Sequence, residues 1–406
     1  MASVNYLVEK PEQSHAISWV SKLLDRAYGG SQRRKRIKVL VNPFSGSGNA
    51  PKWYLRDIEP IFAAARCEVD VERTQFSGHG VEIAQKLDID AYDVIASCSG
   101  DGLPHEVFNG LGRKKNAARA LSKIAVVNLP CGSGNAMSWN LNGTGSPSMA
   151  ALCTVKGIRT PLDLISITQG EKRYLSFLSQ SVGIVAESDL GTEHLRWMGE
   201  ARFTYGILIR LLRKTVYPCH LAVKLEIPTK PRIKEHYRHE LNNHAPADSR
   251  RDSFPDPGLP SLKHGSINFP LPSDWTLIPC DKLGNFYVGN MAFMAASTNF
   301  FPASLPSDGC LDLVTIDSDI SRSAALNCLF AIEKGTFFDL PHVNYRKVSA
   351  YRIIPREKKG YVSIDGERVP FEPFQAEVHR GLGTVLSRSG HLYEAKGVAE
   401  GAREES

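Results

Sequence analysis

The feature that most constrains this chain is a regular alternation of short apolar runs and helical stretches between residues 37 and 160. Strand-like runs occupy 37–41, 68–72, 92–96 and 124–129. Apolar residues at helical spacing, such as Val81, Ala84 and Leu87, lie between two of these runs. Strands that are joined by helices form crossover units, and crossover units build a parallel sheet. We therefore predict an α/β domain in the first part of the chain.

The pattern changes after residue 160, where strand-like runs outnumber helical ones. The runs lie at 163–168, 174–178, 221–227, 285–296, 311–316 and 376–386. Helical stretches are expected near 189–213 and 321–334. A succession of short strands with few helices is typical of a mainly β domain, and a sandwich is one architecture that fits.

The predicted organisation is two domains with an extension, an insertion and a tail. The bounds are 1–33 for the extension, 34–160 for the α/β domain, 161–395 for the β domain and 396–406 for a disordered tail. Residues 229–274 are rich in proline and polar residues, so we expect a mobile insertion. Deletion of 235–270 is expected to leave activity largely intact. The extension holds a short amphipathic helix and the basic run 33–36. That run is a nuclear signal, a lipid-surface patch or a solvated approach to the first strand.

Composition narrows the class of protein. The 406 residues are 42% hydrophobic and 23% charged, which is enough apolar material for a core. A net charge of +6 is mild for a nucleic-acid binder but suits an anionic substrate and an anionic membrane surface. The eight cysteines form no C-x-x-C pair, so we expect reduced thiols and no zinc site. No run of about 18 apolar residues and no signal-peptide pattern occurs, which predicts a cytoplasmic location.

Three glycine-containing loops each follow a predicted strand. They are 42–48 (NPFSGSG), 99–102 (SGDG) and 129–135 (LPCGSGN). Such a loop lets backbone N–H groups approach phosphate oxygens at the start of a helix, although a tight strand-to-helix turn also uses glycine. None of the loops matches the P-loop pattern or the G-x-G-x-x-G fingerprint. Loops at the carboxyl ends of parallel strands converge, so the three together predict one phosphate-binding crevice.

The second loop contains an acid. Asp101 lies between Gly100 and Gly102 directly after an apolar strand. A helix N-cap is the structural alternative, but a cap does not need glycine on both sides. A carboxylate that must approach both a hydroxyl and a phosphate does benefit from so open a loop. Glu106 follows about one helical turn later, near the same crevice.

At these separations and in this order, the motifs resemble the diacylglycerol-kinase catalytic domain family, which includes sphingosine, ceramide and bacterial diacylglycerol kinases. The matching segments are NPFSGSG, SGDGLPHEVFNGL and LPCGSGNAM. Residues 183–190 and 196–203 resemble sphingosine (long-chain base) kinases, fungal ones most closely. Two further family motifs match at 308–312 and 365–367. The resemblance covers about 34–390, apart from the predicted insertion.

The resemblance implies a phosphofructokinase-like three-layer α/β domain, a C-terminal β-sandwich domain, and ATP in the cleft between them. Asp101 would be the general base. The nucleotide-binding residues carried over are Asn42, Pro43, Phe44, Thr74, Glu106, Gly132, Ser133, Gly134, Arg196, Arg202, Asp365, Gly366 and Glu367. The lipid-binding residues carried over are Ser99, Gly100, Asp101, Gly102 and Asp189, the last for the head group. The family often has Gly-Gly-Lys-Gly in the first loop, whereas this chain has SGSG at 45–48, so a lysine that could face ATP is missing.

Several of these residues also have structural interpretations when each is considered alone. Asp365-Gly366 is a preferred pair for a type I′ hairpin turn. Asp189 could be a helix N-cap. Arg196 and Arg202 could lie on a solvated helix face.

Together these observations predict an ATP- and Mg²⁺-dependent lipid kinase. The acceptor would be the primary hydroxyl of a sphingoid long-chain base (sphingosine, sphinganine or phytosphingosine), which becomes the 1-phosphate. A carboxylate at Asp189 suits the protonated amine of such a base, and ceramide and diacylglycerol lack that amine. A ceramide or diacylglycerol kinase is the alternative within the family. A catalytically silent lipid-binding protein would tolerate loss of the acid and the phosphate loops, and both are intact.

The apolar stretch 203–212 is expected to wall an acyl-chain pocket, with a plain core helix as the alternative. We also expect reversible peripheral membrane association around 197–212, assisted by Arg210, Arg213 and Lys214. The pattern assigns neither metal ligands nor an oligomeric state.

Overall fold

The computed structural model describes residues 9–191, 215–243, 247–254, 257–296 and 298–398. The helices are α1 (Gln13–Tyr28), α2 (Ala50–Trp53), α3 (Glu59–Ala64), α4 (His79–Lys86), α5 (Gly102–Gly112), α6 (Ala117–Lys123), α7 (Ala136–Asn142), α8 (Pro147–Lys156), α9 (Ile184–Leu190), α11 (Lys230–Asn242) and α12 (Arg322–Lys334). The strands are β1 (Arg36–Val41), β2 (Glu68–Arg73), β3 (Val94–Ser99), β4 (Ala125–Pro130), β5 (Ile158–Gln169), β6 (Lys172–Ser176), β7 (Ser179–Gly183), β8 (Cys219–Ile227), β9 (Thr276–Ile278), β10 (Leu283–Gly289), β11 (Phe293–Ala295), β12 (Thr298–Asn299), β13 (Leu311–Asp317), β14 (Asn344–Pro355), β15 (Val362–Ile364), β16 (Glu367–Val369) and β17 (Phe374–Ser387).

The first part of the chain forms the predicted parallel sheet, in the order β4-β3-β1-β2. Its register aligns Val39 of β1 with Val71 of β2 and Ala96 of β3. Strands β3 and β4 are buried along their whole length because helices cover both faces, which explains their continuous apolar runs. Since all four strands run in parallel, the loops that follow them emerge at one edge of the sheet.

The second part is the predicted β-sandwich. Antiparallel pairs run in the order β7-β10-β13-β14-β17, with β8 on β14 and β5 on β17. Strand β14 was not predicted, because charged residues interrupt its apolar pattern. One of them, Lys347, is fully buried, and its Nζ lies 2.8 Å from Asp308 Oδ2 and 3.3 Å from Asp312 Oδ2. Buried carboxylates thus neutralise a charge that would otherwise argue against an inner strand.

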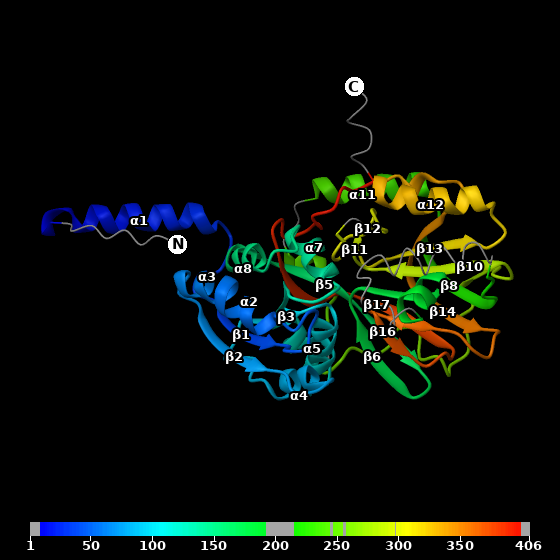
Figure 1. Ribbon diagram of the computed structural model, residues 1–406, viewed down its shortest axis with the longest axis horizontal. Coiled ribbons are helices and arrows are strands. Elements are labelled where there is room, and N and C mark those ends of the chain that lie inside the picture. Colours follow the sequence, from blue (N-terminus) through cyan, green and yellow to red (C-terminus); the bar gives the residue numbers. More distant parts are fainter. Residues whose placement is uncertain (1–8, 192–214, 244–246, 255–256, 297, 399–406) are drawn as a thin grey trace, which may run out of the picture.

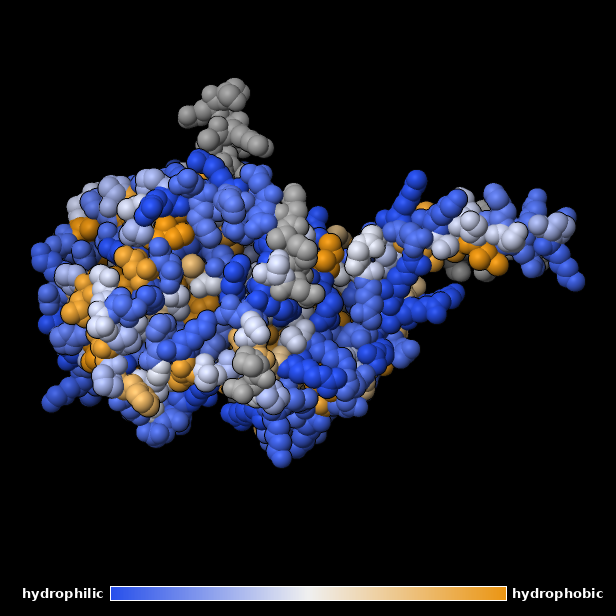
Figure 2. All heavy atoms as spheres, turned by 180° about the vertical axis from the view of Figure 1, so that it is seen from behind, coloured by the Kyte–Doolittle hydropathy of each residue, from blue (hydrophilic) through white to orange (hydrophobic). Residues whose placement is uncertain are grey.

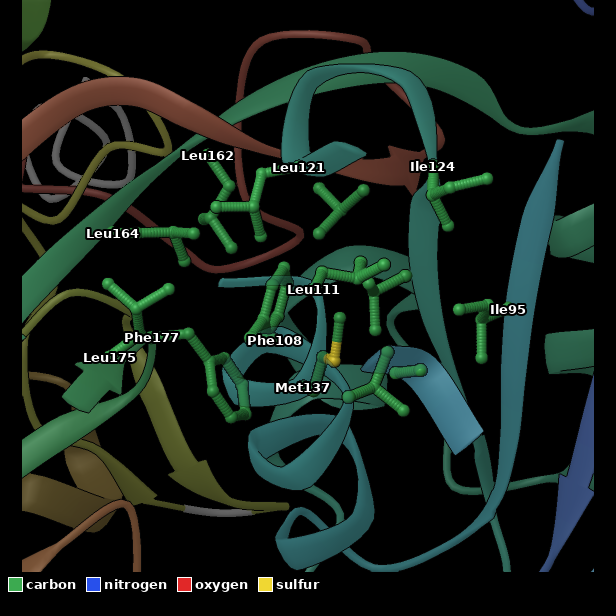
Figure 3. Close-up of a cluster of buried hydrophobic side chains, with 14 of the residues drawn as sticks. Ile95, Phe108, Leu111, Leu121, Ile124, Met137, Leu162, Leu164, Leu175 and Phe177 are labelled. Atoms are coloured by element: carbon green, nitrogen blue, oxygen red, sulfur yellow. The ribbon is translucent and has the colours of Figure 1, made fainter. Parts of the chain in front are cut away.

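The two parts share one sheet and one hydrophobic core. Strand β17 pairs with β5 and β14 and also reaches β4, where Val385 lies opposite Val126. Figure 3 shows the shared cluster, in which side chains of α5 and α6 meet side chains of β5 and β6. Its labelled members are Ile95, Phe108, Leu111, Leu121, Ile124, Met137, Leu162, Leu164, Leu175 and Phe177. The core therefore continues across the predicted boundary at residue 160.

The expectation that 229–274 is a mobile insertion is wrong for the described part of that segment. Helix α11 buries Ile233 completely and leaves Tyr237 5% exposed. Farther along, the backbone N–H of Lys263 donates to Glu377 Oε1 at 2.8 Å. The segment was misjudged because its few apolar residues are spaced four apart on one helix face, and most of its other contacts are polar.

The basic run 33–36 is not exposed along its whole length, so neither an exposed patch nor a solvated connection describes all of it. Lys35 is 2% exposed, and its Nζ donates to Ser31 Oγ at 2.8 Å and to the carbonyl oxygen of Val155 at 2.7 Å. Arg36 forms an ion pair of 2.7 Å with Asp93. Two of the four basic residues therefore anchor the start of β1.

Helix α1 is the predicted amphipathic helix of the extension. It projects from the body of the molecule, and none of its residues is buried (Figure 1). Ile17, Trp19 and Leu23 are 70%, 60% and 51% exposed. Figure 2 shows orange, hydrophobic patches along the projecting helix. Only Tyr28, at the end of α1, packs against a described core cluster, so the rest of the apolar face of α1 is left exposed.

Candidate active site

The three glycine loops converge as predicted. A Cβ atom added to Gly132 would lie 2.3 Å from both N and Cα of Gly100, and one added to Gly100 would lie 2.6 Å from the carbonyl oxygen of Gly134. The N–H of Gly100 donates to Ser45 Oγ at 3.1 Å. The second and third loops therefore touch backbone to backbone, and Ser45 ties the first loop to them.

The first loop keeps an open shape through two residues in left-handed conformations. Gly46 and Gly48 have φ values of +55° and +75°. At the start of the loop, Asn42 Oδ1 accepts a hydrogen bond of 3.0 Å from the backbone N–H of Phe44. The side chain of Phe44 is 78% exposed. This loop lies beside the other two glycine loops, and its predicted contact with a nucleotide stays a prediction.

Asp101 lies where the second and third loops meet. Its Oδ2 accepts from the N–H of Ala136 at 2.8 Å, and its Oδ1 accepts from the N–H of Met137 at 2.9 Å. Asp101 does occupy the N-cap position of α5, as the structural alternative expects, but its side chain makes no cap bond there and instead binds the first turn of α7. Each carboxylate oxygen keeps a second lone pair for another partner.

The environment makes Asp101 a stronger base than an ordinary aspartate. Burial raises the pKa of Asp101 to about 6, the N–H groups of Met137 and Ala136 oppose that shift, and the charge of Asp365 adds to it. The residue nevertheless keeps partial exposure to solvent. A carboxylate with these properties can accept a proton near neutral pH from a group in the crevice.

Glu106 organises the neighbouring loop. Its Oε1 accepts from the N–H of Gly78 at 2.9 Å, and its Oε2 accepts from the N–H of Gly80 at 2.8 Å. Thr74, at the start of that loop, is 6% exposed, and its N–H donates to the carbonyl oxygen of Val41. Both oxygens of Glu106 thus face the protein, so its predicted part in nucleotide binding would act through the loop.

Asp365 and Gly366 form the hairpin turn between β15 and β16, with φ values of +52° and +83°. Both φ values are positive, as a type I′ turn requires. The Asp365 carboxylate is 2% exposed and points into the protein. It accepts hydrogen bonds from Ser176 Oγ, from the N–H groups of Phe177, Leu178 and Ser179, and from His105 Nδ1.

The predicted direct contact of Asp365 with nucleotide is therefore not supported by the geometry, since its carboxylate is occupied by protein donors. Glu367, two residues on, is exposed. Its Oε1 lies 3.0 Å from the position that a Cβ on Gly102 would take, so it reaches across to the catalytic loop.

The predicted lipid-facing residues are only partly described. Asp189 belongs to the last turn of α9, so the N-cap alternative is wrong, and its side chain lies outside the described residues. Arg196, Arg202 and the stretch 203–212 also lie outside them. Ser99 is 1% exposed, and its hydroxyl donates to the carbonyl oxygen of Gly100 at 2.7 Å.

An apolar cavity lies in the second domain beside α9. Its walls come from α9, β10, β13 and α12, so it faces the helix that carries Asp189. Lining residues include Ile184, Val185, Phe300, Ile316, Cys328 and Ile332. Sequence reasoning missed α12 as a wall, because its apolar spacing is equally typical of a plain core helix.

Two residues of α5 were also missed. His105 Nδ1 lies 2.8 Å from Asp365 Oδ2, and Asn109 bonds to the backbone of Leu175. Their only signal in the sequence is the spacing of four, which places both side chains on one helix face.

Among the described residues, no group of three or more His, Cys, Asp or Glu side chains is placed to hold a metal ion. Asp101 belongs to the second glycine loop, and Glu367 reaches that loop. These two carboxylates are the ones that could hold a Mg²⁺ ion, since that ion often keeps several waters and only one or two carboxylates. Within the described ranges, no helix has both the length and the apolar character needed to cross a bilayer.

Comparisons with known proteins agree with this architecture. Residues 36–167 match the diacylglycerol kinase catalytic domain, and residues 284–387 match the YegS C-terminal NAD kinase beta sandwich-like domain. A solved diacylglycerol kinase from Bacillus anthracis str. Sterne superposes with a TM-score of 0.59 at 17% identity, covering 88% of this chain and 99% of that one. At this identity the likeness shows the shared fold.

Curated relatives narrow the family. The chain is 37% identical to sphingoid long chain base kinase 5 of Saccharomyces cerevisiae, covering 96% of this chain but 65% of the relative's length. It is 35% identical to sphingoid long chain base kinase 4 of Schizosaccharomyces pombe, covering 90% of this chain and 78% of the relative. Human sphingosine kinase 1 is 29% identical over 85% of this chain and 88% of its own length. The chain therefore belongs to the sphingoid long chain base kinase (sphingosine kinase) family of lipid kinases.

Proposed function

We propose that this chain transfers the γ-phosphoryl group of ATP to the primary hydroxyl of a sphingoid long-chain base. The observation that carries the proposal is the Asp101 carboxylate, which lies among three loops that can approach phosphate and has a pKa of about 6. The family relatives support the choice of acceptor, since two of them are sphingoid long chain base kinases.

Asp101 would accept the proton of the acceptor hydroxyl as the hydroxyl oxygen bonds to the γ-phosphorus, while the bond between that phosphorus and the β–γ bridging oxygen breaks and ADP leaves. General bases of this kind contribute about 10²–10⁴-fold to rate. The two backbone N–H bonds hold the carboxylate in place, so that its free lone pairs face the acceptor. Loop glycines, including Gly132 and Gly134, allow the backbone to come close to the phosphates. A magnesium ion, when bound, would neutralise phosphate charge, and Asp101 and Glu367 would hold it through water.

The acceptor lipid would enter from the second domain. The apolar cavity between α9 and α12 suits an alkyl chain, because apolar walls such as Ile184, Phe300 and Ile332 exclude water from it. Asp189 belongs to α9, whose first turn lines this cavity, and would pair with the protonated amine of the base. Ceramide and diacylglycerol have no such charge, so this pairing would favour the free base.

We also propose peripheral association with membranes, since the acceptor resides in a bilayer. The exposed apolar side chains of α1, such as Ile17 and Trp19, support a surface that can contact lipid.

A side-by-side assay tests the acceptor. Labelled ATP is offered with sphinganine, phytosphingosine, sphingosine, ceramide and diacylglycerol, and products are separated by chromatography. We expect label in the free bases alone. Label in ceramide or diacylglycerol at an equal rate would contradict the assignment of the acceptor, and no label in any lipid would contradict the kinase assignment.

A further inference from the structure

One face of α5 is docked onto the second domain. His105, Asn109 and Gly112 lie on that face at successive turns. Asn109 Nδ2 donates to the carbonyl oxygen of Leu175 at 2.8 Å, and the N–H of Leu175 donates back to Asn109 Oδ1 at 2.9 Å. A Cβ on Gly112 would lie 2.8 Å from Leu175 Cδ1, so α5 and β6 are in direct contact. The helix that begins beside Asp101 is thereby fixed to the other domain.

His105 adds the charged part of this contact. Its Nδ1 lies 2.8 Å from Asp365 Oδ2, and its side chain is 16% exposed, whereas that of Asp365 is fully buried. The other donors to Asp365 come from the second domain itself: Ser176 Oγ at 2.6 Å and the N–H groups of Phe177, Leu178 and Ser179 at 3.0, 2.9 and 3.0 Å. Among the described residues, His105 is thus the side chain of the first domain that donates to Asp365, beside the four donors of the second domain.

The electrostatics favour a charged pair. Burial alone would lower the pKa of His105, but the hydrogen bond and charge of Asp365, with smaller effects of Glu367 and Glu106, raise it above its ordinary value. A charge-assisted hydrogen bond in a buried site is stronger and geometrically stricter than a neutral one.

We propose that His105 is a positioning residue for phosphoryl transfer: through Asp365 it fixes Asp101, one turn earlier on the chain, relative to the lipid-holding second domain. This inference rests on the proposed function. The backbone N–H of His105 donates to the backbone carbonyl oxygen of Asp101 at 3.2 Å, so the first turn of α5 connects the residue that binds Asp365 to the residue proposed as the base. A base and an acceptor that are held by different domains react only when the two domains are correctly positioned relative to each other. A misplacement of about 1 Å can lower the rate about 10²-fold.

The test compares three variants. His105→Ala removes the hydrogen bond between the imidazole and Asp365. His105→Asn retains an N–H donor near the position of Nδ1 and serves as the conservative rescue. His236→Ala is the matched control, because His236 Nε2 lies 3.1 Å from the buried Asp308 and its side chain is 25% exposed, but both partners lie in the second domain.

We expect His105→Ala to lower kcat by about 10²-fold with little change in the KM for ATP. We expect His105→Asn to recover most of kcat, and His236→Ala to stay within about twofold of wild type, since Lys347 still holds Asp308. A His105→Ala enzyme with wild-type kcat, a failure of His105→Asn to recover activity, or an equal loss in His236→Ala would overturn the proposal.

A second readout separates this inference from the identity of the acceptor. Amide hydrogen exchange at residues 177–179 and in the first turn of α5 should speed up in His105→Ala and not in His236→Ala. The kinetic comparison uses whichever lipid the wild-type protein phosphorylates, so a wrong acceptor contradicts the proposed function without touching this test. Unchanged exchange in His105→Ala would show that the pair does not hold the domains together.

Discussion

The Asp101 carboxylate has a structural task beside the chemical one that we propose for it. It binds the first turn of α7 through Ala136 and Met137, and it borders the crevice in which the phosphates would lie. Its position between two glycines made it a candidate from the sequence alone. Its contacts with α7 were not predictable, because they join residues about 35 positions apart that only the finished sheet brings together.

Replacement of Asp101 by Asn is expected to reduce kcat by about 10²–10⁴-fold, because the amide cannot accept the proton. One amide N–H₂ would also face a backbone N–H of α7, so a loss of stability of about 1–3 kcal/mol is expected. Steady-state kinetics and denaturant unfolding measure the two effects. ATP affinity, measured by calorimetry, should change little, and near-normal turnover would remove Asp101 from the mechanism.

The raised pKa of Asp101 gives a pH dependence with a defined sign. The base works only when ionised, so kcat/KM should fall as pH drops through about 6. For stability the sign is opposite: the folded state binds the proton more tightly than the unfolded state, so this group lowers stability as pH rises from about 4 to about 6. A pH–rate profile with no acid limb near 6 would contradict the assignment.

Asp189→Ala is expected to raise the KM for the sphingoid base at least about tenfold while the KM for ATP stays unchanged, because the loss of a charge-assisted bond acts on the lipid alone. Asn in place of Asp at the same position distinguishes charge from size. An unchanged KM for the base in both variants would separate Asp189 from head-group recognition.

At the scale of elements, strands with a continuous apolar run were predictable from the sequence. Elements in which a buried charge or a few apolar residues depend on distant partners were not. Strands β1, β3 and β4 follow from their buried runs, since a parallel sheet that is covered on both faces needs nothing else. Strand β14 can be buried only because Lys347 has acidic partners such as Asp308. Helix α11 packs only because other elements cover Ile233 and Tyr237. Those partners are distant in sequence, so local pattern carries no signal for them.

The packing of α11 leads to a direct test. Ile233→Ala removes a fully buried side chain and should lower the free energy of unfolding by about 2–5 kcal/mol. Leu277→Ala is the control, because Leu277 is 69% exposed and should change stability by less than about 0.5 kcal/mol. Equal effects in chemical denaturation would mean that α11 lies free of the second domain.

At the scale of the whole molecule, membrane association should be reversible and electrostatically assisted. Basic residues near an anionic surface contribute about 1 kcal/mol each, and salt screens that attraction. Co-sedimentation with anionic vesicles should therefore fall across a salt series, and neutral vesicles should bind less. Binding that survives high salt and alkaline carbonate would indicate a different mode of attachment. The predicted contacts Arg213 and Lys214 lie outside the described residues.

Strand β17 has a consequence for how the protein is made. It supplies the neighbour of β4 at Val385 and, with Leu382, part of the core that the α/β domain shares. The ribosome must add about 250 residues after β4 before Val385 emerges, which takes roughly 12–50 s at about 5–20 residues per second. During that time the core of the nascent α/β domain lacks Leu382 and Val385. This kinase should therefore depend on chaperones that hold an unfinished domain on the ribosome.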